Sequence, residues 1–79
     1  MAQKPADVFR RNVAAVLHDR DMTMEELAKL CDTSRPNISR ILSGLEQVSL
    51  ERAGRIAKAL HLPLSDLVSP QFKILEKIA

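Results

Sequence analysis

The sequence has 79 residues, a formal net charge of +2 and a pI near 9.0, and 46% of its residues are hydrophobic. This length allows one domain with a modest core, which must be aliphatic because Phe9 and Phe72 are the only aromatic residues. A single cysteine excludes an intrachain disulfide framework and a multi-cysteine zinc site. The sequence has no apolar run of membrane-spanning length and no signal-peptide core, so we expect a cytoplasmic protein.

Apolar residues recur with helical spacing along nearly the whole chain, which predicts an all-α fold. The first helix is expected from about Ala6 to Asp19, after a flexible arm over residues 1–5. Thr23 begins a second helix of about two turns. Thr23 and Glu26 have the spacing of a capping box, in which each side chain bonds the other residue's backbone amide.

A third helix is predicted within residues 33–44, after a turn too short for anything but a helix-to-helix connection. Ser34 is its cap, Pro36 is acceptable in its first turn and Gly44 ends it. Asp32 would take the left-handed backbone conformation in that turn, which Asp tolerates less well than Gly.

On a helical wheel the third helix has an apolar side and a polar, cationic side. The core side carries Ile38, Ile41, Leu42 and Leu45. The opposite side carries Pro36, Arg40 and Ser43, flanked by Asn37 and Ser39, while Arg35 can reach out past the helix end. No carboxylate lies between Thr33 and Gly44.

Three more helices complete the prediction. The fourth follows the cap Ser49, and its inner face carries Leu50, Ala53, Ile56, Ala57 and Leu60. A short fifth helix spans Leu64 to Val68, and a C-terminal helix, Gln71 to Ile78, follows Ser69-Pro70. The apolar stripe of this last helix (Phe72, Ile74, Leu75 and Ile78) could pack on its own domain, form a homodimer interface or bind another protein.

The polar side of the third helix has chemistry suited to the DNA major groove. Arg can donate two hydrogen bonds to a guanine edge, Asn can pair with adenine, and Ser can bond bases or phosphates. The alternative is that Arg35 and Arg40 are ordinary solvated charges. The absence of acids and the preceding tight turn favour DNA contact.

The segment from Met22 to Val68 resembles the Cro/C1-type helix-turn-helix family (XRE-like, lambda-repressor-like), which includes phage repressors, controller proteins and small antitoxins. The resemblance rests on these residues of the sequence: Thr23, Glu26, Leu27-Ala28, Ser34, Ile38-Ser39-Arg40-Ile41, Gly44, Ser49-Leu50 and Ile56-Ala57-Lys58-Ala59-Leu60. It implies one compact domain of five to six helices over residues 1–79, whose second and third helices form the helix-turn-helix. Residues 70–79 would then be a candidate dimerisation element.

The resemblance also implies roles for individual residues. Base-reading positions of the family fall on Arg35, Pro36, Asn37, Ser39 and Arg40. Phosphate contacts fall on Ser34, Ser43 and the N-terminal end of the second helix at Thr23, with Arg52 in the first turn of the fourth helix as a further candidate. Family members commonly bind near-palindromic operators as two-fold dimers.

The sequence departs from the family pattern at several positions. Met24 stands where relatives often have Gln, and Asp32 replaces the usual Gly of the turn. Leu17 and Leu42 replace a frequent Arg–Glu pair, which an apolar pair can do without loss of stability. Leu45-Glu46-Gln47 replaces a loop that is usually basic, so we expect modest affinity for DNA per monomer.

Other chemistry is disfavoured by the sequence. Arg55 and Lys58, with Arg52, fit a solvated outer face of the fourth helix, and Cys31 fits a small buried apolar residue rather than a redox sensor. Glu25 and Glu26 fit capping rather than catalysis. His18, His61 and Cys31 have no metal-ligand spacing. We therefore expect no enzyme activity, no metal and no cofactor.

Two functions of different classes follow. The first is a sequence-specific DNA-binding transcriptional regulator, in the form of a dimeric repressor. The second is an antitoxin-type interaction module that binds a partner protein, such as a toxin, through the C-terminal helix and regulates its own gene. The operator and the choice between repression and activation cannot be read from the sequence.

Overall fold

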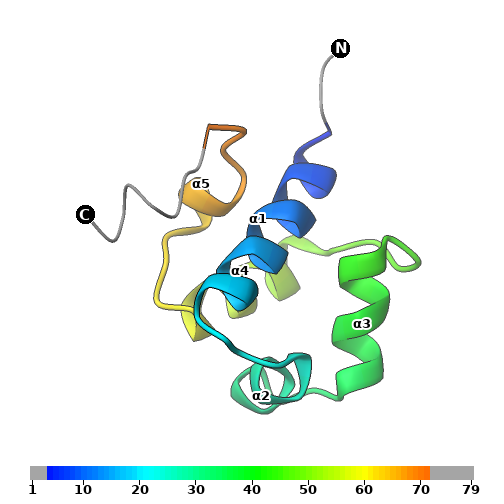
Figure 1. The fold of residues 1–79 in the computed structure, drawn as a ribbon. Coiled ribbons are helices and arrows are strands. Elements are labelled where there is room, and N and C mark those ends of the chain that lie inside the picture. Colours follow the sequence, from blue (N-terminus) through cyan, green and yellow to red (C-terminus); the bar gives the residue numbers. More distant parts are fainter. Residues whose placement is uncertain (1–3, 72–79) are drawn as a thin grey trace.

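The computed structural model describes residues 4–71, which fold into five helices (Figure 1). These are α1 (Pro5–Asp19), α2 (Met24–Leu30), α3 (Arg35–Ser43), α4 (Leu50–Ala59) and α5 (Leu64–Leu67). Over these residues no strand is present, so the predicted all-α fold is confirmed. None of the helices in this part of the chain is long and apolar enough to cross a membrane.

Local sequence signals set the helix starts. Thr23 accepts a hydrogen bond from the Glu26 backbone N–H (3.0 Å), and its own N–H donates to the Glu26 carboxylate (2.9 Å), which completes the predicted capping box. Ser34 and Ser49 cap α3 and α4 in the same way. One boundary differs from the prediction: Pro5, assigned to a flexible arm, is the first residue of α1. The fixed φ of proline suits that position.

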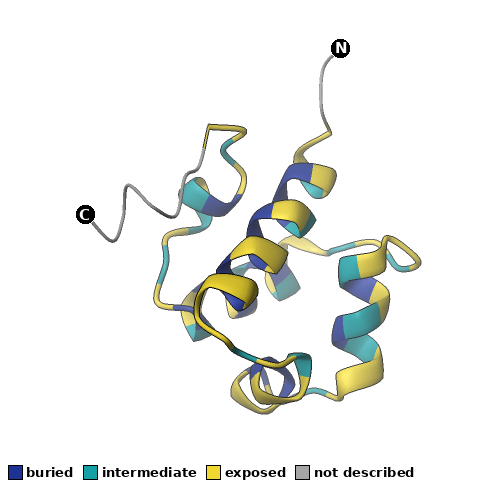
Figure 2. Ribbon diagram, in the orientation of Figure 1, coloured by how far each residue is buried: buried dark blue, intermediate teal, exposed yellow. Residues whose placement is uncertain are grey.

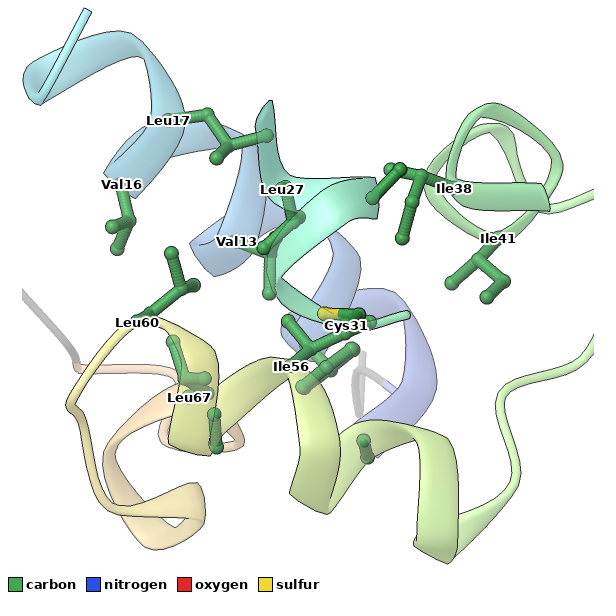
Figure 3. Close-up of a cluster of buried hydrophobic side chains, with 14 residues drawn as sticks. Val13, Val16, Leu17, Leu27, Cys31, Ile38, Ile41, Ile56, Leu60 and Leu67 are labelled. Atoms are coloured by element: carbon green, nitrogen blue, oxygen red, sulfur yellow. The ribbon is translucent and has the colours of Figure 1, made fainter. Parts of the chain in front are cut away.

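All five helices contribute aliphatic side chains to one core, on the helix sides that face one another (Figures 2 and 3). Figure 3 places Leu27, Ile38, Ile41, Ile56 and Leu67 around a common centre with Val13 of α1. Leu17 is buried and Leu42 packs against the same cluster, in keeping with an apolar pair at these positions.

Two leucines expected in the core are instead exposed. Leu45 is 82% exposed, because Gly44 takes a φ of 86° and turns the chain out of the helix before Leu45. Leu50 is 80% exposed. It is the first residue of α4, and the buried face of that helix begins one turn later, at Ala53.

Polar side chains of α1 and the turn that follows it cap the C-terminal ends of α3, α4 and α5. The Arg10 Nε donates to the Ile41 carbonyl oxygen of α3 (2.8 Å), and an Arg20 guanidinium nitrogen donates to the Leu60 carbonyl at the end of α4 (2.7 Å). The buried Asn12 amide donates to the carbonyl oxygens of Leu67 and Ser69 (both 2.9 Å). The last carbonyls of a helix have no partner within it, so these bonds fix α3, α4 and α5 relative to α1.

The predicted C-terminal helix, Gln71 to Ile78, lies outside the described residues except for Gln71. Its apolar stripe of Phe72, Ile74, Leu75 and Ile78 is also outside them. At the end of the described chain, the Gln71 backbone N–H donates to the Ser69 hydroxyl (3.3 Å).

Candidate nucleic-acid interface

Helix α3 presents its predicted polar side to solvent because its apolar side is anchored. Ile38 and Ile41 are 1% and 2% exposed and lie in the core (Figure 3). The Ser34 hydroxyl accepts from the Asn37 N–H (3.4 Å), and Gly44 ends the helix in the left-handed conformation. The helix therefore has one side buried in the core and an opposite side that is exposed or half-buried (Figure 2).

A tight turn joins α2 to α3. The backbone N–H of Thr33 donates to the Ala28 carbonyl (2.9 Å), and that of Asp32 donates to the Lys29 carbonyl (3.2 Å). Asp32 has a φ of 56°, so it occupies the left-handed position as predicted. This pattern ends α2 and starts α3 within a few residues. Helix α3 then packs across both α2 and α1.

A chain of hydrogen bonds runs along the exposed side of α3. The Asn37 amide nitrogen donates to the Thr33 hydroxyl (3.0 Å), and a guanidinium nitrogen of Arg40 donates to the Asn37 amide oxygen (2.7 Å). The Arg40 side chain is 52% exposed. Arg40 and the half-buried Asn37 thus lie side by side on the polar side of α3, and this bond occupies only one of the Arg40 donors.

Comparison with known families agrees with this geometry. A family model described as "Helix-turn-helix" matches residues 14–67, which is more than half of the chain. The chain belongs to this family. It is a DNA-binding transcription regulator of the Cro/C1 type, and α3 occupies the place of the recognition helix. No curated protein and no solved structure matches the chain.

In this helix-turn-helix protein, the residues predicted to contact DNA lie in different surroundings. Ser34, Arg35 and Pro36 are exposed at the start of α3, and within residues 4–71 the Arg35 guanidinium makes no hydrogen bond or ion pair. Ser39 is half-buried. The exposed Ser43 hydroxyl donates to the Arg40 carbonyl oxygen (3.2 Å), so Ser43 keeps its oxygen as an acceptor.

Thr23 is the N-cap residue of α2. Its side chain is exposed, and its oxygen is occupied by the capping box. The Thr23 backbone N–H lowers the pKa of the Glu26 carboxyl below its ordinary value of 4.5, and the Thr23 side chain adds to this effect. A carboxylate thus stands beside Thr23 at neutral pH.

The sequence favoured a solvated outer face of α4 for Arg52, but in the structure Arg52 is only partly exposed and pairs with an acid. It is half-buried at the start of α4, and one guanidinium nitrogen lies 3.4 Å from the Glu46 Oε1. The other Glu46 oxygen lies 3.7 Å from the Arg40 Nε. The absence of acids within α3 therefore does not leave Arg40 unpaired, because Glu46 of the following loop lies beside it.

Sequence reasoning missed Arg10 as well as the position of Glu46. Besides Ile41, Arg10 contacts the Asp7 carboxylate (2.8 Å) and the Glu46 backbone carbonyl (3.4 Å). No local motif marks the contacts with Ile41 and Glu46, since these residues are 31 and 36 positions from Arg10. A signal for Glu46 does exist: it is the acid in the loop directly after the cationic helix.

Cys31 has the environment predicted for it. It is 8% exposed and lies beside Ile56 in the core (Figure 3). Burial raises the pKa of the Cys31 thiol, and the nearby Arg55 charge offsets only part of this rise. The thiol is therefore a poor nucleophile at neutral pH.

Proposed function

We propose that this regulator recognises a specific operator by placing residues 34–44 in the major groove. The observation that carries the proposal is the exposed Arg40, whose guanidinium lies 2.7 Å from the amide oxygen of the half-buried Asn37, on a helix whose other side is buried in the core. Two such side chains can reach the edges of neighbouring bases, Arg40 preferring guanine and Asn37 adenine.

The other predicted contacts divide into two groups in this proposal. Arg35, Pro36 and Ser39 lie beside the pair and read further base edges. Ser34, Ser43, Thr23 and Arg52 contact phosphates and fix the position of α3 on the duplex. Phosphate contacts carry no sequence information, so selectivity rests on the first group and on the pair of Arg40 and Asn37.

We further propose that the protein acts as a dimeric repressor on a near-palindromic operator. Support comes from the resemblance to the family, whose members commonly bind as two-fold dimers, and from the small core of a domain this size. A dimer doubles the few base contacts that one short helix can make.

Selection of bound fragments from random duplex DNA tests the proposal. A site with two inverted halves about one helical turn apart is the expected product. Arg40→Ala is then expected to lose discrimination between this site and random duplex. Arg55→Ala is the matched control, because Arg55 is an exposed arginine on α4 that pairs with Glu51 (3.1 Å). Recovery of no enriched sequence, or unchanged discrimination in Arg40→Ala, would refute the role given to α3.

The alternative function, an antitoxin-type module, depends on the apolar stripe of residues 72–79, which are outside the described residues. Light scattering of the purified protein separates the two proposals. A symmetric dimer that binds DNA without another chain supports the repressor. A stoichiometric complex with the product of an adjacent gene supports the antitoxin.

A further inference from the structure

One carboxylate joins two of the arginines proposed to contact DNA. The two oxygens of Glu46 lie 3.7 Å from the Arg40 Nε and 3.4 Å from an Arg52 guanidinium nitrogen. Together with the bonds from Asn37 to Thr33 and from Arg40 to Asn37, these interactions form a continuous polar network from the helix-turn-helix turn to α4. Glu46 is the acid of this network, and its side chain is 40% exposed.

The backbone of Glu46 is held on both sides. Its N–H donates to the Arg40 carbonyl oxygen (3.2 Å), and its carbonyl accepts from Arg10 (3.4 Å). Arg10 is fixed in turn by Asp7 and by the Ile41 carbonyl, both at 2.8 Å. The Glu46 carboxylate therefore leaves the loop from a defined point, close to both guanidinium groups, rather than from a free chain.

A carboxylate in this position acts differently on two kinds of DNA complex. Binding to random sequence depends almost entirely on neutralising phosphates, and it weakens when two cations are already paired with an acid. Binding to a matching site adds direct hydrogen bonds between Arg40 and a base edge. Those bonds can replace the interaction of Arg40 with Glu46.

We propose that Glu46 is a specificity-determining residue, which keeps Arg40 and Arg52 from phosphates of random duplex and releases Arg40 to a matching base. Glu46 acts through the two arginines and need not touch DNA itself. This inference rests on the proposed function, because it assumes that α3 faces the groove.

The test compares Glu46→Gln with Glu51→Gln. Both substitutions remove one negative charge from an arginine-paired carboxylate, since Glu51 pairs with Arg55 on the exposed face of α4. The net charge of the two variants is the same, and so is any general increase in attraction to DNA. Only the first variant frees Arg40 and Arg52.

The measurement is fluorescence anisotropy with a labelled random-sequence duplex over a series of sodium chloride concentrations. Glu46→Gln is expected to bind this duplex about tenfold more tightly than the wild type. The slope of its log K against log salt should steepen by about one unit for each additional phosphate that a freed arginine neutralises. Glu51→Gln is expected to stay within about twofold of the wild type, with an unchanged slope. For the duplex recovered by selection, Glu46→Gln tightens binding less, so discrimination falls.

Arg52 provides a second variant. Adding Arg52→Gln to Glu46→Gln should bring the salt slope back by about one unit, because one freed cation is then removed. Equal affinities of Glu46→Gln and Glu51→Gln for random duplex would overturn the inference, even if selection recovers an operator and the proposed function stands. Failure of the wild type and of both variants to bind any duplex would overturn the inference and the proposed function together.

Discussion

The Arg10 Nε donates a 2.8 Å hydrogen bond to the carbonyl oxygen of Ile41, 31 positions away, and so joins α1 to the last turn of the recognition helix. The same guanidinium reaches the Glu46 carbonyl at 3.4 Å, beyond the end of the helix. One side chain therefore fixes both the end of α3 and the start of the loop that carries Glu46.

Replacing Arg10 by Met should test this bracing role. Met keeps an apolar stem of similar length, but the Ile41 and Glu46 carbonyls lose a charged donor in a half-buried position. We expect the free energy of unfolding to fall by about 2 kcal/mol in urea titrations. Arg11→Met is the control: Arg11 is exposed and makes a 3.3 Å bond to the Pro70 carbonyl, so its loss should change stability by less than about 0.5 kcal/mol. Equal losses in the two variants would contradict the bracing role.

Asp32→Gly should stabilise the protein. Asp32 has a φ of 56° in the turn of the helix-turn-helix, a conformation that disfavours a Cβ. We expect stability to rise by about 0.5 to 1 kcal/mol, an effect partly reduced by the greater freedom of glycine in the unfolded chain. For a domain of this size, that increase raises Tm by several degrees, at about 4 to 8 °C per kcal/mol.

The control for Asp32→Gly is Asp19→Gly, which removes the same charge at the last residue of α1. There the backbone is helical, and glycine should lower Tm rather than raise it. Calorimetry that gives the same sign for both variants would show that charge, and not backbone conformation, decides the effect.

Glu26 should make stability depend on pH. Its bond from the Thr23 N–H lowers the pKa of the folded-state carboxyl below 4.5, so the carboxylate is favoured by folding. The resulting stabilisation is complete above the ordinary carboxyl pKa and is lost as pH falls through the lowered folded-state pKa. Urea titrations at several pH values should therefore show a smaller loss of stability on acidification in Glu26→Gln than in the wild type.

Glu25→Gln serves as the reference for that pH series. Glu25 lies in the same first turn, but its carboxylate faces Lys29 at 4.0 Å instead of the cap. If both variants shift the acid limb of the stability curve equally, the general loss of charge explains the result and the capping box does not.

The Cys31 thiol should react slowly while the protein is folded. It is buried, and burial raises its pKa, so little thiolate is present near neutral pH. We expect a disulfide reagent to modify Cys31 at least about tenfold more slowly in buffer than in urea. Equal rates in the two solvents would mean that the core around α2 opens readily, and would contradict the packing shown in Figure 3.

The sequence by itself determined the five helices of residues 4–71 and most of their ends. Thr23, Ser34, Ser49 and Gly44 were predicted as caps or stops, and each has that role. These signals are readable because a cap bonds a backbone group only two or three residues away. The family also followed from local patterns, and the match over residues 14–67 confirmed it. The assignment of individual DNA-contacting residues stays a prediction.

Only the tertiary structure decided which leucines are exposed and which charged side chains pair with one another. Helical spacing predicted that Leu45 and Leu50 face the core, but both are exposed. Such spacing applies only within a helix: Leu45 lies beyond the end of α3, and Leu50 is the first residue of α4. Glu46 lies beside Arg40 because the loop after Gly44 turns back toward α3, where the Arg10 guanidinium donates a hydrogen bond to the Glu46 carbonyl oxygen. Interactions between residues so far apart in the chain depend on how whole helices pack, and no local pattern encodes them.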